Sequence, residues 1–513
     1  MGRRRRAVAV GLGGLTLAAG GAAVLVGGSV AAQGDPPQPA AVAASGASHG
    51  LHGAPASAGQ RPAALKLDFT PGRPLVEPPV ITPKRGVTSI DLTAKTVRTE
   101  IGGAQAISNV FNGLLPAPTV EVSPGQRLRI KLTNDNPDAE PTNLHTHGLH
   151  VSPRSPGDNV FLNLPTGSSY QYVHNIPRDH VPGVYWYHPH RHEFTDTQVF
   201  AGQSGAIIVR GGLDDLPAIK NLRDRVMVFQ SFQLDDKGRV LRQPSSSQPA
   251  KQLQLINGQL RPRIDMRPGE TQRWRILNTS ADKFLVLRLR GHNMWLLADD
   301  GNPRATPERV SKQFIGPGER REVLVQATKA GRFDLQSLYF VPVRAQPSYS
   351  SPTRNIGTVV VSGEPMEPQP IPERLLPVED LRTAKVDRRR QIVFGEGFDA
   401  ATQTPSFTIN GREFDPNFIA ETMKLNTVEE WTIRNTTDEW HTFHIHVNPF
   451  QVTKINGKRV KGVQWNDDIT VGPYGGTVTM RTRFTDFTGK FVIHCHVLFH
   501  EDNGMMAAVQ VVK

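Results

Sequence analysis

One sequence pattern occurs three times in this 513-residue chain and limits the folds that the chain can adopt. Each copy contains an apolar residue followed by Asn-Gly, a dipeptide that favours the tight turn of a β-hairpin. The three dipeptides begin at Asn112, Asn257 and Asn410. Because a chain of this length exceeds what one compact core accommodates, the pattern predicts similar domains in tandem.

Each copy continues with a strand, a turn and a second strand, which closes on another asparagine. The second strands alternate polar and apolar residues, as in RLRIKL and RWRIL, and this alternation is typical of a half-buried β-strand. The closing asparagines are Asn134, Asn278 and Asn435. The chain is also rich in Gly (47 residues) and Pro (41 residues), which favour short strands and turns. We therefore predict an all-β fold of Greek-key sandwiches or barrels.

Shifts in composition place the limits of these domains. We predict the three domains at residues 85–211, 212–364 and 389–513, with a proline-rich linker at 365–388. Residues 33–84 are a low-complexity stretch of Ala, Pro, Gly and Ser, and such a composition predicts a flexible linker.

Residues 1–32 resemble an export signal peptide. The arginines from Arg3 to Arg6 precede a long uncharged run of small apolar residues, which ends in small residues suited to cleavage. The arginine pair before this run resembles a twin-arginine signal, and an uncleaved membrane anchor is the alternative. We expect an exported protein, periplasmic or extracellular, that has no membrane attachment after cleavage.

The charge of the chain points to no macromolecular partner. The formal net charge of +12 includes the four arginines of the predicted signal. The rest of the sequence has no basic run interleaved with aromatic residues, so we expect no binding to nucleic acid. The single cysteine cannot form an internal disulfide bond. We expect the protein to be a monomer.

Histidines cluster in the first and third copies of the repeat. Four pairs have the form His-x-His, and on a strand the two members of each pair share a face. These pairs are His145/His147, His188/His190, His444/His446 and His494/His496. The second copy has Gln336 and Leu338 where the other two copies have a pair. The symmetry predicts eight imidazoles that converge between the first and third domains, a donor set that suits copper.

Cys495 lies between His494 and His496 and therefore faces the other side of its strand. Its expected partners are histidines outside the pairs, His441 and His500. Two histidines and one thiolate, with a weak axial methionine, describe a blue-copper centre. Met505 is the candidate for the axial position and Met506 is its competitor. Structural zinc is the chemical alternative, although zinc prefers paired cysteines.

Four motifs resemble those of multicopper oxidases of the bacterial laccase type, and the resemblance covers residues 85–513. They are HTHG (145–148), WYHPH (186–190), HTFHIH (441–446) and HCHVLFHEDNGM (494–505). The resemblance implies three cupredoxin domains and four copper ions per chain. The implied ligands of type 1 copper are His441, Cys495, His500 and Met505. Those of type 2 copper are His145 and His444, and those of the type 3 pair are His147, His188, His190, His446, His494 and His496.

The resemblance also implies a reaction. One-electron oxidation of a phenol or aromatic amine at type 1 copper is coupled to reduction of O2 to water at the other three ions. Cys495 carries the electrons, and Glu501 and Asp158 are the expected proton relays. The alternative is a metallo-oxidase of cuprous or ferrous ions, although no methionine-rich segment is present. A copper-binding electron carrier or copper store without oxidase activity is the alternative from another class.

Overall fold

The structure is a computed structural model. It describes residues 69–235, 237–241, 252–343, 350–399 and 404–513. The predicted export signal and residues 33–68 of the predicted linker lie outside the described residues. Within the described ranges, no helix is both long enough and apolar enough to cross a membrane.

The described chain is nearly all β-strand, which confirms the predicted fold class, and each third of the chain packs two sheets against each other. In the first third, one sheet has the order β1 (Val80–Ile81), β4 (Ala117–Val122), β9 (Gly205–Val209), β8 (Gly183–His188), β6 (His145–His147). The other has the order β3 (Ala104–Phe111), β2 (Val87–Ile101), β5 (Arg127–Asp135), β7 (Ser169–Asn175). The short helix α1 (Thr195–Ala201) links β8 to β9.

The second third contains a larger sandwich. Its first sheet has the order β12 (Gln259–Leu260), β11 (Gln252–Ile256), β10 (Arg223–Gln233), β14 (Thr271–Asn278), β19 (Arg320–Gln326), β16 (Met294–Asp299), β17 (Asn302–Val310). Its second sheet has the order β13 (Arg263–Met266), β21 (Arg354–Val361), β20 (Gly331–Ser337), β15 (Leu285–Leu289), β18 (Gln313–Ile315). The 3-10 turn η2 (Gly212–Asp215) precedes this domain, and η5 (Leu381–Thr383) follows it.

The last third repeats the two-sheet plan. One sheet has the order β23 (Thr404–Ile409), β22 (Arg388–Asp399), β25 (Thr427–Asn435), β31 (Thr477–Phe484), β27 (Phe450–Ile455), β28 (Lys458–Arg459), and β29 (Trp465–Asn466) pairs with β27. The other has the order β24 (Ile419–Lys424), β33 (Met506–Val512), β32 (Gly489–Cys495), β26 (His441–Ile445), β30 (Asp468–Val471). The helix α2 (Leu498–Asp502) lies between β32 and β33.

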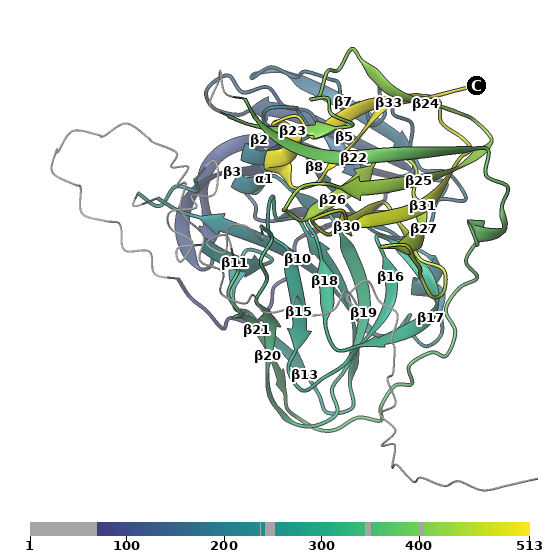
Figure 1. Ribbon diagram of the computed structural model, residues 1–513. Coiled ribbons are helices and arrows are strands. Elements are labelled where there is room, and N and C mark those ends of the chain that lie inside the picture. The colour runs from purple at the N-terminus through teal and green to yellow at the C-terminus, as the bar shows by residue number, and fades with distance from the viewer. Residues whose placement is uncertain (1–68, 236, 242–251, 344–349, 400–403) are drawn as a thin grey trace, which may run out of the picture.

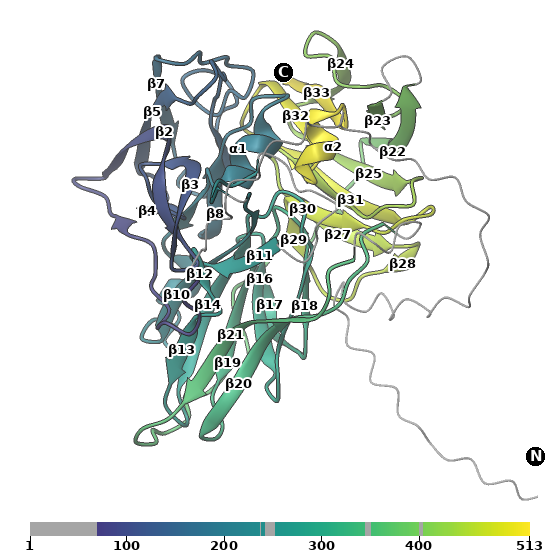
Figure 2. The ribbon, with the colours of Figure 1, turned by 90° about the vertical axis from the view of Figure 1, so that its left-hand side faces the viewer.

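The three sandwiches form a triangle, in which the second lies below the other two (Figures 1 and 2). Helices α1 and α2 lie side by side where the first and third domains meet, and Val199 of α1 belongs to the same apolar cluster as Leu498 of α2. Ala281, from the second domain, is part of this cluster too. All three domains therefore meet near the ends of β8 and β32.

The structure explains the repeated Asn-Gly dipeptides. Asn112, Asn257 and Asn410 have φ angles of 55°, 51° and 53°, and each is followed by a glycine with positive φ. This left-handed conformation suits Asn and Gly and closes a tight turn. Each asparagine side chain also accepts a hydrogen bond of 2.8 Å from a backbone N–H of the strand that pairs with the one before the turn, namely β2, β10 or β22.

The asparagine that closes the second strand of each copy holds the following loop in place by hydrogen bonds. The Asn278 side chain donates to the carbonyls of Lys283 and Ile315 and accepts from the Ser280 backbone N–H. Asn134 makes the same kinds of bond in the first domain and Asn435 makes them in the third. A buried amide with all of its groups satisfied is thus a common structural device of the three domains.

Replacement of Asn278 by alanine should destabilise the protein. The change leaves buried backbone groups without partners, and each orphaned group costs about 1–3 kcal/mol of unfolding free energy. The measurement is the urea midpoint of the full chain, compared with Asn417→Ala, which removes an exposed asparagine. Equal midpoints for the two variants would contradict the fastening role.

Candidate metal centre

Strand pairing places the predicted histidines at equivalent positions in the first and third domains. His145 on β6 lies opposite His188 on β8, and His444 on β26 lies opposite His494 on β32. In the second domain the corresponding strands β15 and β20 place Arg288 opposite Gln336, and the two side chains form a hydrogen bond of 2.8 Å. The second domain therefore uses an ordinary polar pair where the other two use imidazoles.

The structure brings all eight paired histidines together at the interface between the first and third domains. None of them is more than 2 % exposed. The rings interleave, since His145 stacks on His446 with centroids 3.8 Å apart and His147 stacks on His444 at 3.9 Å. Each stacked pair joins one ring from the first domain to one from the third. Both domains are therefore needed to build the cluster.

One nitrogen of most rings is held by an acceptor at the edge of the cluster. His145 Nδ1 lies 2.7 Å from Asp158 Oδ2, and His147 Nε2 lies 2.6 Å from Asp468 Oδ2. Nδ1 of His188 lies 2.7 Å from the carbonyl oxygen of Pro189, and Nδ1 of His444 lies 2.9 Å from that of Asp467. These acceptors hold the proton on the outer nitrogen and leave the inner nitrogen with a free lone pair.

The inner nitrogens have no protein partner. The buried unpartnered atoms include His145 Nε2, His147 Nδ1, His188 Nε2, His444 Nε2 and both ring nitrogens of His496. Three further inner atoms crowd together, since His494 Nε2 lies 3.2 Å from both His190 Nε2 and His446 Nε2. Only some of these nitrogens can carry a proton, so lone pairs face one another. Such an arrangement is costly unless a cation lies among them.

Burial keeps these imidazoles neutral. Burial, followed by repulsion from neighbouring rings, lowers the pKa of His188 to about 3. For His190, burial outweighs the nearby Glu501 carboxylate and lowers the pKa to about 4. Burial lowers the pKa of His145, His444 and His496 far below the usual range as well. Neutral imidazole is the form that binds a metal.

The donor set therefore fits copper. The groups whose ligand atoms lie within 4.8 Å of one another include His145/His147/His188, His145/His444/His446 and His190/His446/His494. Imidazole is a borderline donor that suits late first-row metals, and the cluster offers more nitrogens than one ion takes. All of these histidines are among the ligands that the sequence predicts for the larger cluster.

A second, smaller cluster surrounds Cys495. Its sulfur lies 3.4 Å from His441 Nδ1 and 3.8 Å from His500 Nδ1, and these two nitrogens are 3.0 Å apart. All three side chains are buried. Met505 is fully buried in the same core cluster as Cys495, and its carbonyl oxygen accepts a hydrogen bond from the Cys495 N–H at 3.0 Å. Met506 instead packs with Val492 in a separate cluster.

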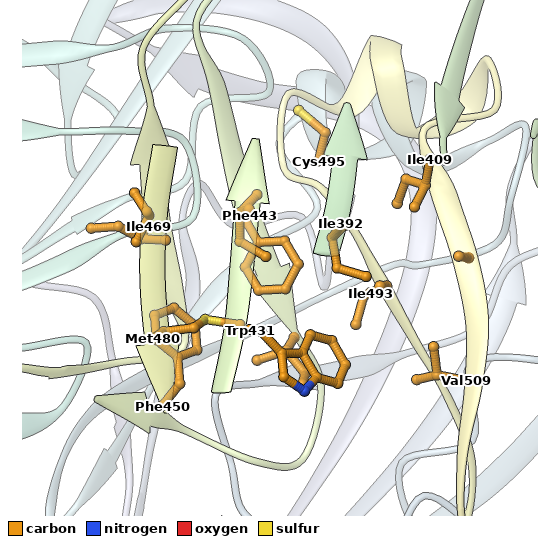
Figure 3. Close-up of a cluster of buried hydrophobic side chains, with 14 of the residues drawn as sticks. Ile392, Ile409, Trp431, Phe443, Phe450, Ile469, Met480, Ile493, Cys495 and Val509 are labelled. Carbon is orange, nitrogen blue, oxygen red and sulfur yellow. The ribbon is translucent and has the colours of Figure 1, made fainter. Parts of the chain in front are cut away.

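Strand β32 separates the two clusters by alternation. Phe491, Ile493 and Cys495 face the core of the third domain, and Figure 3 shows Cys495 at the edge of that core. His494 and His496 belong to the ring contacts of the eight-histidine cluster. Successive residues of one strand thus serve two sites, as the alternation of side chains in a strand requires.

The loop before β26 sets the orientation of His441. The Thr437 hydroxyl donates to Asn435 Oδ1 at 2.9 Å, so it accepts from His441 Nε2, which lies 2.7 Å away. A proton on Nε2 leaves Nδ1 free toward Cys495 and His500. On the other predicted ligand, Glu439 Oε2 lies 3.0 Å from His500 Nε2 and accepts its proton, so that Nδ1 is the nitrogen that faces Cys495.

His500 and Glu439, at the smaller cluster, carry opposite charges that shift each other's pKa. Burial alone would lower the pKa of His500, but the carboxylate of Glu439 and the neighbouring Cys495 raise it to about 10. The imidazolium of His500 in turn lowers the pKa of Glu439, against the effect of burial. Without a metal, the pair behaves as a buried ion pair, and a bound cation is the natural replacement for the proton.

The two predicted proton-relay acids both lie beside the larger cluster. Glu501 is fully buried, with Oε2 at 3.0 Å from His494 Nδ1 and Oε1 at 3.5 Å from His190 Nδ1. Asp158 accepts from the Thr146 N–H at 2.7 Å as well as facing His145. Burial raises the pKa of Asp158 to about 7 despite these hydrogen bonds. Both acids therefore lie at the edge of the cluster, in contact with its imidazoles.

Sequence patterns did not identify several of the supporting residues. Thr437, Glu439, Asp467 and Asp468 hold predicted ligands, but none belongs to a His-x-His or Cys motif. Glu439 lies two residues before His441, and this proximity is the one local indication that it supports the site.

The remaining described histidines lie outside both clusters. His150 lies 2.9 Å from Asp486, and His192 packs on Phe414. The others are His174, His180 and His292, and the N–H of His150 donates to His180 Nε2 at 3.0 Å. His49 and His52 lie outside the described residues.

Comparisons with known proteins agree with this geometry. Models of a family described as multicopper oxidase match residues 93–213, 227–354 and 386–513. The chain is 28% identical to the multicopper oxidase mco of Staphylococcus aureus over 85% of this chain and 92% of that protein.

Two solved structures resemble the chain over most of its length. One is a multicopper oxidase from Campylobacter jejuni, titled a metallo-oxidase (TM-score 0.77, 28% identity, 87% of this chain and 96% of that one). The other is the laccase-like CueO from Ochrobactrum sp., with activity towards lignin model compounds (TM-score 0.73, 26% identity, 86% of this chain and 100% of that one).

Replacement of Asp158 by asparagine should weaken metal binding at the larger cluster. The amide cannot accept from both His145 and Thr146 as the carboxylate does, and loss of such an outer partner typically lowers metal affinity about 10- to 100-fold. Competition with a chelator of known affinity measures the change. Asp179→Asn, at an exposed position, is the control, and equal affinities in the two variants would contradict the role of Asp158.

Proposed function

Because this chain belongs to the multicopper oxidase family, we propose that it is a laccase-like oxidase of phenols or aromatic amines. The observation that supports the proposal is that β32 joins two clusters of possible metal ligands, the eight histidines and the group around Cys495. Bound copper supplies one-electron oxidation at the Cys495 cluster and four-electron reduction of O2 at the histidine cluster. The predicted ligand sets are adopted here as part of the proposal.

The chain itself supplies the electron route between the clusters. Cys495 is bonded through the backbone to His494 on one side and His496 on the other. In addition, His494 Nδ1 lies 3.1 Å from the Cys495 carbonyl oxygen, which makes a shorter hydrogen-bonded path. A donor can therefore be oxidised at one cluster without reaching the other. Separation of the sites keeps radical products away from the place where O2 is reduced.

Protons reach the histidine cluster through acids in this proposal. Reduction of O2 to two waters consumes four protons, and positioned carboxylates transfer protons efficiently. Glu501 contacts His190 and His494, and Asp158 contacts His145, so each serves a different edge of the cluster. Glu501 lies on α2, and the residue before it, His500, belongs to the other cluster.

A specific observation supports a second candidate, the oxidation of metal ions. Acids gather near His500: Glu439 contacts it, and Glu396 lies close enough for its charge to interact with those of Glu439, Asp438 and His500. Burial, and then repulsion from Glu439 and Asp438, raises the pKa of Glu396 to about 7. Such a group attracts a cationic donor. The likeness to the Campylobacter jejuni metallo-oxidase supports the same candidate.

Replacement of Cys495 by serine should abolish the blue colour and the oxidase activity. Serine offers no thiolate to the smaller cluster, whereas the eight histidines remain, so type 2 copper stays visible by electron paramagnetic resonance. Met506→Leu, which alters the separate apolar cluster, is the control and should keep the colour. Retained activity in Cys495→Ser, or loss of all copper, would contradict the division into two sites.

The choice of donor is tested by Glu396→Gln, with Glu373→Gln at an exposed position as the control. If metal ions are the substrate, removal of the negative charge should raise KM for ferrous or cuprous ion about fivefold, or ~1 kcal/mol. KM for a neutral phenol should stay the same. If phenols are the substrate, the wild-type enzyme should turn over the phenol much faster than either ion. Faster turnover of the ions would exclude the laccase-like proposal.

A further inference from the structure

The second domain contributes no histidine to either cluster, yet one of its side chains reaches the larger one. Arg320 is the first residue of β19 and is fully buried. Its Nη1 donates to Asp467 Oδ1 at 2.5 Å and to Asp468 Oδ2 at 3.0 Å. Its Nη2 donates to Asp467 Oδ2 at 2.6 Å. The guanidinium therefore donates hydrogen bonds to two adjacent carboxylates of the third domain.

These two carboxylates position histidines of the larger cluster. Asp468 Oδ2, which accepts from Arg320, lies 2.6 Å from His147 Nε2. Asp467 Oδ1 lies 3.2 Å from the same nitrogen, and the Asp467 carbonyl oxygen lies 2.9 Å from His444 Nδ1. The chain of contacts thus runs from the second domain, through the third, to His147 of the first. Its last step decides which nitrogen of His147 faces the cluster.

Arg320 is also tied to all three domains. Its Nε donates to the carbonyl oxygen of Val184 in the first domain at 3.3 Å, and its Nη2 donates to that of Asp300 in the second domain at 3.1 Å. A planar guanidinium with fixed donors suits such a site, because it satisfies several acceptors in one geometry. Without its charge, Asp467 and Asp468 would face each other in a buried site with no cation between them.

A second contact from the same turn supports this role. Gly318 has a φ of +88°, and a Cβ at this position would lie 2.9 Å from the ring of His496. It would also lie 3.1 Å from Asp468 Oδ1. The turn from Gly318 to Arg320 therefore packs directly against one predicted ligand and holds another through Asp468.

We propose that Arg320 is a positioning residue of the eight-histidine cluster, through which the second domain sets the geometry and copper affinity of a site that it does not ligate. The proposal rests on the proposed function, because the cluster must hold copper. It assigns to Asp467 and Asp468 the task of transmitting the position of Arg320 to His147 and His444. The Cys495 cluster makes no contact with Arg320 among the described hydrogen bonds, so its properties should be independent of this residue.

The competing explanation is that Arg320 only stabilises the fold. Arg275 provides the matched control, since it is equally buried and lies on β14, the neighbour of β19. It pairs with carboxylates of Asp214 and Asp224, and none of its described bonds reaches a histidine or a histidine's partner. Loss of either arginine should destabilise the protein, but only loss of Arg320 should alter the cluster.

The experiment compares the wild-type holoenzyme with Arg320→Gln, Arg320→Lys and Arg275→Gln. Copper is counted per chain after dialysis against a chelator, and type 2 copper is followed by electron paramagnetic resonance. We expect Arg320→Gln to bind type 2 and type 3 copper about 10- to 100-fold more weakly, with a changed type 2 spectrum. The blue band and the KM for the electron donor should stay unchanged. Arg320→Lys, which keeps the charge without the fork, should be intermediate, and Arg275→Gln should match the wild type.

The outcomes separate the two hypotheses. If the wild type itself shows no type 2 copper, the proposed function fails. If the wild type holds four coppers and Arg320→Gln matches Arg275→Gln in copper retention and spectrum, Arg320 is only a structural residue and this inference fails. The blue band reports that the third domain is folded. Should Arg320→Gln yield no folded protein, Arg320→Lys and Gly318→Ala decide the question, and wild-type copper retention and spectra in both would overturn the inference.

Discussion

The alternation of side chains along β32 makes one strand contribute to both clusters. His494 and His496 face the interface with the first domain, whereas Cys495 between them faces the core of the third. A single strand therefore belongs to two clusters that lie back to back. The shift of one residue in register would exchange these faces and destroy both sites. Pairing of β32 with β26 and β33 holds that register.

Burial of eight imidazoles removes their hydrogen bonds to water, and the rest of the interface must replace these bonds. The rings have no solvent to satisfy their nitrogens, so carboxylates and carbonyl oxygens at the periphery take the outer N–H groups. Those carboxylates are buried as well and require their own partners. Arg320 supplies one such partner from the second domain. The contacts that support the site are thus distributed over all three domains.

Much of this could be predicted from local sequence. The Asn-Gly turns and the alternating strands predicted an all-β fold, and the structure confirms it. The i, i+2 spacing predicted that each His-x-His pair shares a face, and the structure places the four pairs in one cluster. These features depend on neighbouring residues in a strand, so the sequence expresses them directly. Assignment of each histidine to a particular copper ion stays a prediction.

The contacts that local sequence could not reveal join distant segments. Arg320 meets Asp467, and Asp468 meets His147, only because three domains pack in one arrangement. Glu439 meets His500 because the segment between β25 and β26 lies beside helix α2. The periodic pattern of residues within a strand gives no information about contacts between such distant segments.

The central claim is that two separate clusters act together as one oxidase. The most direct test is the number of donor electrons consumed per O2 by the copper-loaded protein, measured with an oxygen electrode and a one-electron donor while hydrogen peroxide is assayed. The proposal predicts four electrons per O2 and no peroxide. A ratio of two with stoichiometric peroxide, or no oxygen uptake with all copper sites filled, would contradict it.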